Sequence, residues 1–405
     1  MNKDDADDLI NNLISLYNGQ MDSETFNQIL IPNYTDISGN SYFHFLTEYS
    51  FKEFCLRNMK LNKKGKFTYE NYTQIKSEYT QQIIFFINTL LENNCDIFLV
   101  NVNNQSPLIL SLNNKNYIMS KEFLNILQNL GLYTKEDYFD FLDIIIKNGN
   151  CFDNDFLDLI NIILNNINDL NNTEVQKNKL SEMIISLCIN FSKNIYEKFN
   201  ETILITGLDY IEINENNNIG IKQDENLIDN IKKKSINIFN DYINQNFLSI
   251  FLKLIKLGGN IQYKKESGFI YLMSYPFISD LEKFVQENKV DINFQDESGN
   301  TAIINLINKK EYIIQISKDV YDAAFKYLTN NINIDIKKNT DKEKSVFYLC
   351  LKKNYIEEAK IIYAKFKNLH SFFNPIILNF IITQKNTKEI IEFLSIVCII
   401  FFHTN

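Results

Sequence analysis

The sequence predicts an all-α fold, an α-solenoid of stacked helix-turn-helix repeats joined by short β-turns or hairpins. One turn signature, followed by an apolar pattern at helical spacing, recurs along the 405 residues with the same internal offsets. A unit of that size cannot bury its own apolar face, so it must stack on a neighbour. The hydrophobic fraction of 45% is normal for a folded chain.

The turn signature is clearest in DINFQDESGNTAIINLIN, residues 291–308. The stretch LLENNCDIFLVNVNNQSPLILSL, residues 90–112, reproduces its offsets without a gap. Residues 254–273 and 36–46 repeat parts of it, and residues 335–351 repeat it loosely. Each copy therefore predicts a turn, a short helix, a loop and a second helix.

Each residue type that recurs at the same place in these copies has a physical reason. A turn position with positive φ favours Gly, or else Asn, and is predicted at Gly39, Asn104, Gly268 and Gly299. A hydroxyl at the start of the next helix can cap it, and this role is predicted for Ser41, Ser106, Thr301 and Ser345. Pro107 suits the first helical position. Asn94 and Gly258 suit a left-handed helix stop.

The pattern resembles the ankyrin repeat, which has a period of about 33 residues and opens its first helix with T-P-L-H. Ser106-Pro107-Leu108 stands in for Thr-Pro-Leu, and Ser41-Tyr42-Phe43-His44 keeps the His. Ile304 and Ile109 occupy that His position in other copies. The resemblance implies that the His44 imidazole bonds the Ser41 hydroxyl and ties adjacent turns together.

Spacing predicts the domain organisation. Residues 1–30 are expected to form an N-terminal helical cap, 31–153 a first ankyrin-like block, 154–245 a divergent Asn-rich helical segment, and 246–402 a second block with a C-terminal helix. We expect a long loop near residues 212–226, a repeat ending at 144–149 and an insertion around 309–319. The 65 residues from Ser41 to Ser106 predict one degenerate unit between them.

Motifs for catalysis, cofactors and metals are not found. The sequence has no G-x-G, and none of its three His has a second His or a Cys at ligand spacing. We therefore expect no enzyme, no cofactor, no metal and no small-molecule substrate. A net charge of −9 without clustered Arg argues against nucleic acid.

The expected location is the cytoplasm, with the nucleus left open. Six widely spaced Cys indicate thiols in a reducing compartment, and the start MNKDDADDLI does not look like a secretory signal. The apolar run at residues 393–402 is about half the length of a membrane span. It is interpreted as a buried helix, with a truncated tail and a membrane anchor as alternatives.

The remaining hypothesis is a scaffold or adaptor that binds another protein through the concave face of the array. The candidate partner-binding residues lie at the turns: Val102, Asn103, Gln105, Glu266, Ser267, Phe269, Glu297, Ser298 and Asn300. The alternative is a regulatory ankyrin region of an enzyme or membrane-associated protein. Its effector part would be missing or would lie in the C-terminal tail.

Overall fold

The computed structural model describes residues 3–61, 69–131, 133–149, 151–167, 173–208, 225–331, 334–335 and 345–365. Over these residues the predicted all-α class is confirmed, with one two-stranded hairpin as the only sheet. The chain forms two compact units, residues 1–170 and 171–405. This division falls inside the Asn-rich segment 154–245 and not at either of its predicted ends. The apolar run 393–402 lies outside the described residues.

The N-terminal unit consists of helices, most of which pack in pairs. The helices are α1 (Lys3–Tyr17), α2 (Ser23–Ile29), α3 (Tyr42–Leu46), α4 (Phe51–Leu61), α5 (Tyr69–Glu92), α6 (Pro107–Asn113), α7 (Tyr117–Asn129), α8 (Lys135–Asn148) and α9 (Asn154–Asn166). Helices α6 and α7 form one pair and α8 and α9 the next. In the segment predicted as a cap, α1 packs on α3 and α5.

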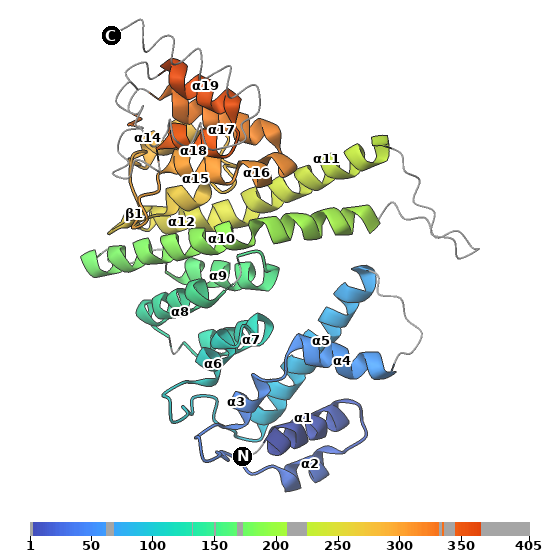
Figure 1. The fold of residues 1–405 in the computed structure, drawn as a ribbon. Helices are drawn as coiled ribbons and strands as arrows, with labels where there is room; N and C mark the ends of the chain where they lie inside the picture. Colours follow the sequence, from blue (N-terminus) through green and yellow to red (C-terminus); the bar gives the residue numbers. More distant parts are fainter. Residues whose placement is uncertain are drawn as a thin grey trace, which may run out of the picture. The chain divides into compact units, whose positions relative to one another are not determined.

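The pairs stack in two rows, which can be followed in Figure 1. One row is α3, α6 and α8, and the other is α5, α7 and α9. Phe43 of α3 and Phe123 of α7 meet edge to face at 6.1 Å, and both are fully buried. The apolar faces therefore close on one another between pairs, as short amphipathic units require.

The predicted degenerate unit between Ser41 and Ser106 is wrong. The two turns that precede these serines are direct neighbours, because the Val102 N–H donates to the Ser38 carbonyl at 2.9 Å. The residues between the two turns instead form α3, α4 and the 24-residue helix α5.

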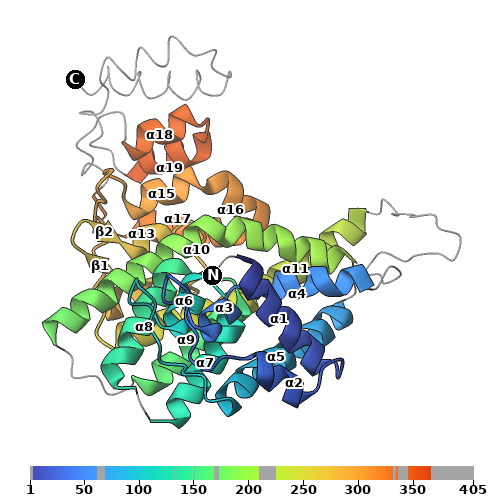
Figure 2. The same ribbon diagram turned by 90° about the horizontal axis from the view of Figure 1, so that it is seen from below.

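The C-terminal unit begins with much longer helices. Its elements are α10 (Glu174–Leu208), α11 (Glu225–Tyr242), the π-helix η1 (Ile243–Leu248), α12 (Ser249–Lys256), β1 (Gln262–Tyr263), β2 (Glu266–Ser267), α13 (Gly268–Leu272), α14 (Leu281–Glu287), α15 (Ala302–Asn308), α16 (Lys310–Ile316), α17 (Lys318–Asn330), α18 (Val346–Lys352) and α19 (Ile356–Lys365). Helix α10 has 35 residues and packs on α11, α12 and α13. Figure 2 shows α10 and α11 lying alongside each other.

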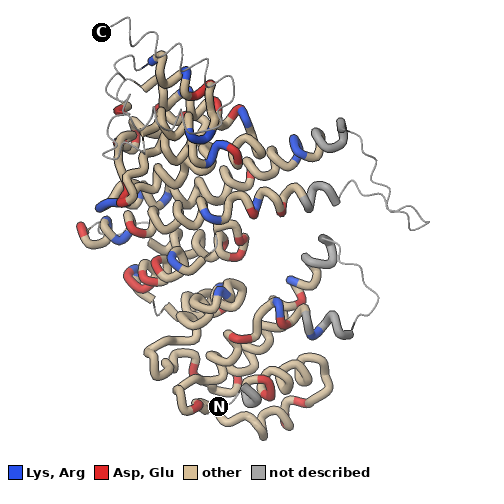
Figure 3. Tube along the Cα trace, in the orientation of Figure 1, with Lys and Arg blue, Asp and Glu red and all other residues tan. Residues whose placement is uncertain are grey.

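The short helices of this unit again stack in sequence order, α13 on α15 and α15 on α18. The residues around 309–319, where a loop insertion was predicted, form the helix α16, which lies between α15 and α17 in the chain and contacts both. Most of the loop predicted near 212–226 falls outside the described residues. Acidic positions are frequent along α8 and α9, whereas Lys and acidic residues are interspersed in the C-terminal unit (Figure 3).

Candidate functional site

Three turns, at residues 36–40, 101–105 and 296–300, share one hydrogen-bond pattern and are called the tips below. Oδ1 of the first residue accepts from the backbone N–H groups two and four positions later, at 2.7 to 3.0 Å. The N–H of that residue donates to the carbonyl four positions later at 3.0 Å in every tip. The fourth residue has positive φ, which confirms the predicted roles of Gly39, Asn104 and Gly299.

The geometry also sets the charge state of the first tip. Burial by itself would raise the pKa of Asp36. Hydrogen bonds from the Asn40 backbone and side chain and from the Ser38 backbone outweigh burial and hold that pKa below its ordinary value. Asp36 therefore stays ionised and keeps accepting the bonds that shape the turn.

The fourth predicted turn is built differently, and its predicted register is wrong. Gly268 is not a turn residue with positive φ but the first residue of α13. The actual turn is the tight β1–β2 hairpin, in which Lys264 has a φ of +56°. Ser267 and Phe269 are consequently buried, with 0% and 1% of their surface exposed, and do not face a partner.

The predicted helix caps form at two of the four positions as simple N-caps. Ser106 Oγ accepts from the Ile109 N–H at 3.3 Å, and Ser345 Oγ accepts from the Tyr348 N–H at 3.2 Å. Thr301 stands at the start of α15, but its buried hydroxyl finds no partner among the described residues. Its predicted capping bond is therefore wrong.

Side-chain amides bond backbone groups that lie far along the chain, a feature that sequence reasoning missed. Asn33 Oδ1 accepts from the Asp96 N–H at 2.8 Å, and Asn293 Oδ1 accepts from the Asp335 N–H at 2.7 Å. Gln262 accepts from the Asp291 N–H at 2.8 Å and donates to its carbonyl at 2.7 Å. These bonds are called the amide links below. In the sequence, each amide link begins at an Asn or Gln that stands two positions after the residue aligned with Asp291.

His44 adds a second connection between the first two repeats. Its Nδ1 lies 3.0 Å from the Ser41 backbone nitrogen and 2.9 Å from Ser41 Oγ, and its Nε2 lies 2.8 Å from the Gln105 carbonyl oxygen. A backbone N–H can only donate and a carbonyl can only accept, so Nδ1 is the acceptor and Nε2 carries the proton. Burial lowers the pKa of His44, which favours this neutral form.

The first two tips display apolar side chains to solvent. Ile37 is 95% exposed and Val102 is 70% exposed, and the bond from Val102 to Ser38 holds the two tips together. Phe98 and Val100, just before the second tip, are about half exposed. Asn103 is also exposed and Gln105 is half-buried. In the C-terminal unit Glu297 and Ser298 are exposed, while Asn300 and Glu266 are half-buried.

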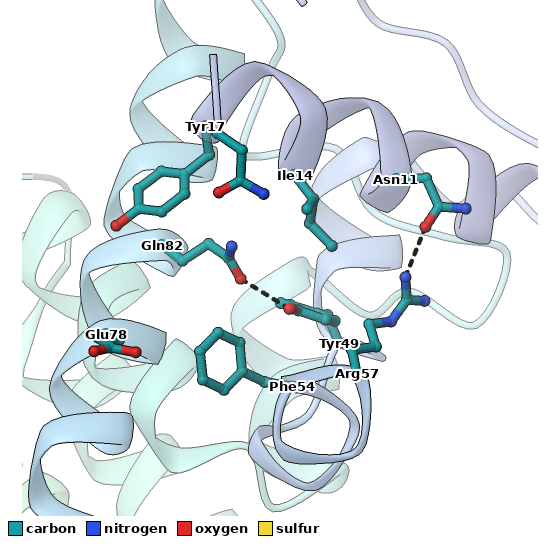
Figure 4. A pocket seen from close by; sticks show the side chains of 9 residues that line it. Asn11, Ile14, Tyr17, Tyr49, Phe54, Arg57, Glu78 and Gln82 are labelled. Carbon is teal, nitrogen blue, oxygen red and sulfur yellow. Dashed lines mark hydrogen bonds between the residues drawn. The ribbon is translucent and has the colours of Figure 1, made fainter. Parts of the chain in front are cut away.

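A cavity of about 350 Å³ lies beside α1, α4 and α5 in the same N-terminal unit (Figure 4). Its lining is Asn11, Ile14, Tyr17, Asn18, Tyr49, Phe54, Arg57, Glu78 and Gln82. Tyr49 and Phe54 are buried, and the Tyr49 hydroxyl donates to Gln82 Oε1 at 2.8 Å. The cavity combines aromatic walls with polar groups from three helices, which is typical of small-ligand sites. Sequence reasoning missed it because these helices are far apart in the chain.

No cluster of His, Cys, Asp and Glu among the described residues could hold a metal ion. No described helix is both long enough and apolar enough to cross a membrane. No protein-family model matches the sequence, and no curated protein matches it significantly.

Proposed function

We propose that this chain is a non-enzymatic scaffold that binds a partner protein through the tips of an ankyrin-like solenoid. The observation that carries the proposal is the pair of neighbouring tips in the N-terminal unit. Their backbones are joined through Val102 and Ser38, and each tip holds one aliphatic side chain, Ile37 or Val102, in solvent. Aliphatic side chains exposed on a structured turn contribute nothing to burial and are typical of a recognition surface.

The ankyrin-like character is supported by three kinds of contact. The tips repeat one turn geometry, the amide links join one repeat to the next, and the short helices stack in chain order. Arrays of this kind use the exposed edge of the stack as an extended binding surface. Absence of disulfides among the described cysteines fits a cytoplasmic location.

The proposed partner presents an apolar segment to the N-terminal tips. Interfaces bury their apolar residues at the centre and keep polar groups at the rim. Ile37 and Val102 would form the centre, with Asn103 and Gln105 beside them. Glu266, Glu297, Ser298 and Asn300 are a second, polar contact region in the C-terminal unit. Ser267 and Phe269 are left out because they are buried.

A capture experiment with matched variants tests the proposal. Wild type would be compared with the Ile37→Asp and Val102→Asp double variant, with a Glu266→Arg, Glu297→Arg and Asn300→Arg triple variant, and with Val175→Asp. Val175 is 76% exposed on α10, so its change controls for a new surface charge. We expect one captured protein to be retained by wild type and Val175→Asp and lost by the double variant.

The captured protein must then be purified and measured directly. Its affinity for the double variant should be at least about tenfold weaker than for wild type, the scale of an interface centre losing two apolar side chains. Equal affinity for all variants would mean that the tips are only turns. Loss of affinity with the triple variant alone would place the binding surface in the C-terminal unit.

A further inference from the structure

We propose that the cavity beside α1, α4 and α5 binds an organic cation on an apolar stem, that is, a primary amine or guanidinium group. The shared chemistry can come from a free diamine or from a Lys or Arg side chain of a peptide. This site is separate from the tips, so the proposal stands or falls independently of the scaffold function. Its volume of about 350 Å³ suits a ligand of this size.

The walls fit the apolar stem and the face of a cation. Tyr49 and Phe54 are 1% and 4% exposed, so their rings are fixed in place. The exposed Tyr17 ring is held edge-on against Phe85 at 5.2 Å, and Figure 4 shows it across the cavity from Phe54. Aromatic faces attract alkyl ammonium and guanidinium groups. The Arg57 guanidinium already lies over the Tyr49 ring, 5.8 Å from its centroid. Tyr17 and Phe54 are therefore the faces left for a ligand.

The charges around the cavity are unbalanced. The cavity's own cation, Arg57, is already engaged: it lies 2.7 Å from Glu53, 3.3 Å from Asp7 and 2.6 Å from Asn11 Oδ1. Its charge is therefore neutralised before any ligand arrives. Asn11 and Glu53 also fix its guanidinium as a rigid edge of the cavity.

Glu78 supplies the unmatched negative charge. It is exposed on α5, accepts from Gln74 Nε2 at 3.1 Å, and has no cationic partner among the described residues. Asp7 and Glu53 pair with Arg57, so Glu78 is the carboxylate of the cavity lining that lacks a cationic partner among the described residues. A ligand with a positive charge near Glu78 would restore the balance.

Gln82 constrains how a ligand can be oriented in the cavity. Its side chain is 5% exposed, and its Oε1 is occupied by the Tyr49 hydroxyl. Its Nε2 has no hydrogen-bond partner among the described residues and lines the cavity. An amide donor that is open to the cavity and has no protein partner can donate to an oxygen acceptor on the ligand's stem, such as a peptide carbonyl.

Calorimetric titration of the full chain tests the site with three probes: agmatine, the peptide Gly-Arg-Gly, and the neutral isostere Gly-citrulline-Gly. We expect at least one cationic probe to bind with a dissociation constant on the order of 1 mM or tighter. The citrulline peptide should bind at least about threefold more weakly than the arginine peptide, as the loss of one exposed ion pair implies. Preference for the peptide over agmatine would identify a protein side chain as the ligand, and the reverse a free amine.

Two variants locate the binding. Glu78→Gln should weaken binding of the cationic probe by about threefold or more, and Tyr17→Ala should weaken it by a similar factor through loss of the aromatic wall. Glu92→Gln is the matched control, because Glu92 is also exposed on α5 but does not line the cavity. Thermal melting confirms that each variant is folded. No binding of either cationic probe, or equal weakening by Glu78→Gln and Glu92→Gln, overturns the proposal.

Discussion

The two units build the same turn but display different side chains on it. The N-terminal tips place Ile37 and Val102 in solvent, whereas the corresponding position of the third tip is Glu297. The β1–β2 hairpin of the C-terminal unit exposes Lys264 and Lys265. The first and fourth residues of a tip determine its backbone, and the second residue points away and is free to vary. At the tips, the two units therefore differ in the side chains that they expose and not in the backbone of the turn.

Breaking a buried ion pair should give the largest difference in stability loss between the two units. Lys310 lies 2.6 Å from Glu358, with 19% and 10% of the two side chains exposed. Lys310→Met leaves a buried carboxylate without its cation, and we expect a loss of about 3 kcal/mol in the C-terminal unit. Hydrogen exchange of peptides from each unit would measure it.

The matched change in the N-terminal unit is Lys76→Met. Lys76 lies 2.7 Å from Asp155, but 28% and 27% of these side chains are exposed. Because solvent screens this pair more, the loss should be about 1 kcal/mol or less. Equal losses of stability in the two units would contradict the expectation that solvent screening weakens the Lys76–Asp155 pair.

Glycine substitution should expose a difference between the tips themselves. Gly39 and Gly299 both have a φ of +74°, so Ala at either position is strained by about 1–2 kcal/mol. A Cβ at Gly39 would also lie 3.1 Å from the Val102 nitrogen and 3.2 Å from the Asn101 Cα, whereas a Cβ at Gly299 meets nothing within 4 Å. Gly39→Ala should therefore lower the melting temperature more than Gly299→Ala.

The stability of the N-terminal unit should depend on pH through His44. Its pKa is lowered in the folded chain, so its contribution is present above the ordinary His pKa of about 6.5 and is lost as pH falls through the lowered pKa. A proton on Nδ1 would face the Ser41 N–H, donor against donor. In the C-terminal unit the corresponding residue is the buried Ile304. Hydrogen exchange at several pH values should show the loss in wild type and not in His44→Gln.

The smallest effect on stability is expected at the displayed side chains. Ile37→Asp and Val102→Asp change residues that are 95% and 70% exposed, so each should alter the free energy of unfolding by no more than about 0.5 kcal/mol. Chemical denaturation monitored by circular dichroism would test this. A larger loss would assign these side chains a packing role and weaken the proposed binding surface.

Local features were predictable from the sequence, and long-range ones were not. The turns at Gly39, Asn104 and Gly299 depend on side chains within five residues, so pattern reading finds them. The hairpin at Lys264 was misread because a Lys at positive φ leaves no local signal. The lengthening of the first repeat was misread as an extra unit because spacing alone does not distinguish a longer helix from another repeat.

The cavity is a second long-range feature that could not be predicted from the sequence. Tyr17 comes from α1, which is far in the chain from α4 and α5, the helices that carry Arg57 and Gln82. Neither residue type nor spacing marks them as neighbours, since the contact arises only when α1 packs against α5. The His44 bonds were predicted because the resemblance supplied the partner, not because the residues alone did.

The amide links have a consequence for how such a chain can change over evolutionary time. The bonded residues are 63, 29 and 42 positions apart in the three cases. The bond joins a side chain to a neighbouring backbone and places no demand on the length of chain between them. Helices such as α4 and α16 therefore fit between the two ends of a link without disturbing it. A chain built in this way can change the length of these intervening segments and keep the same bonds.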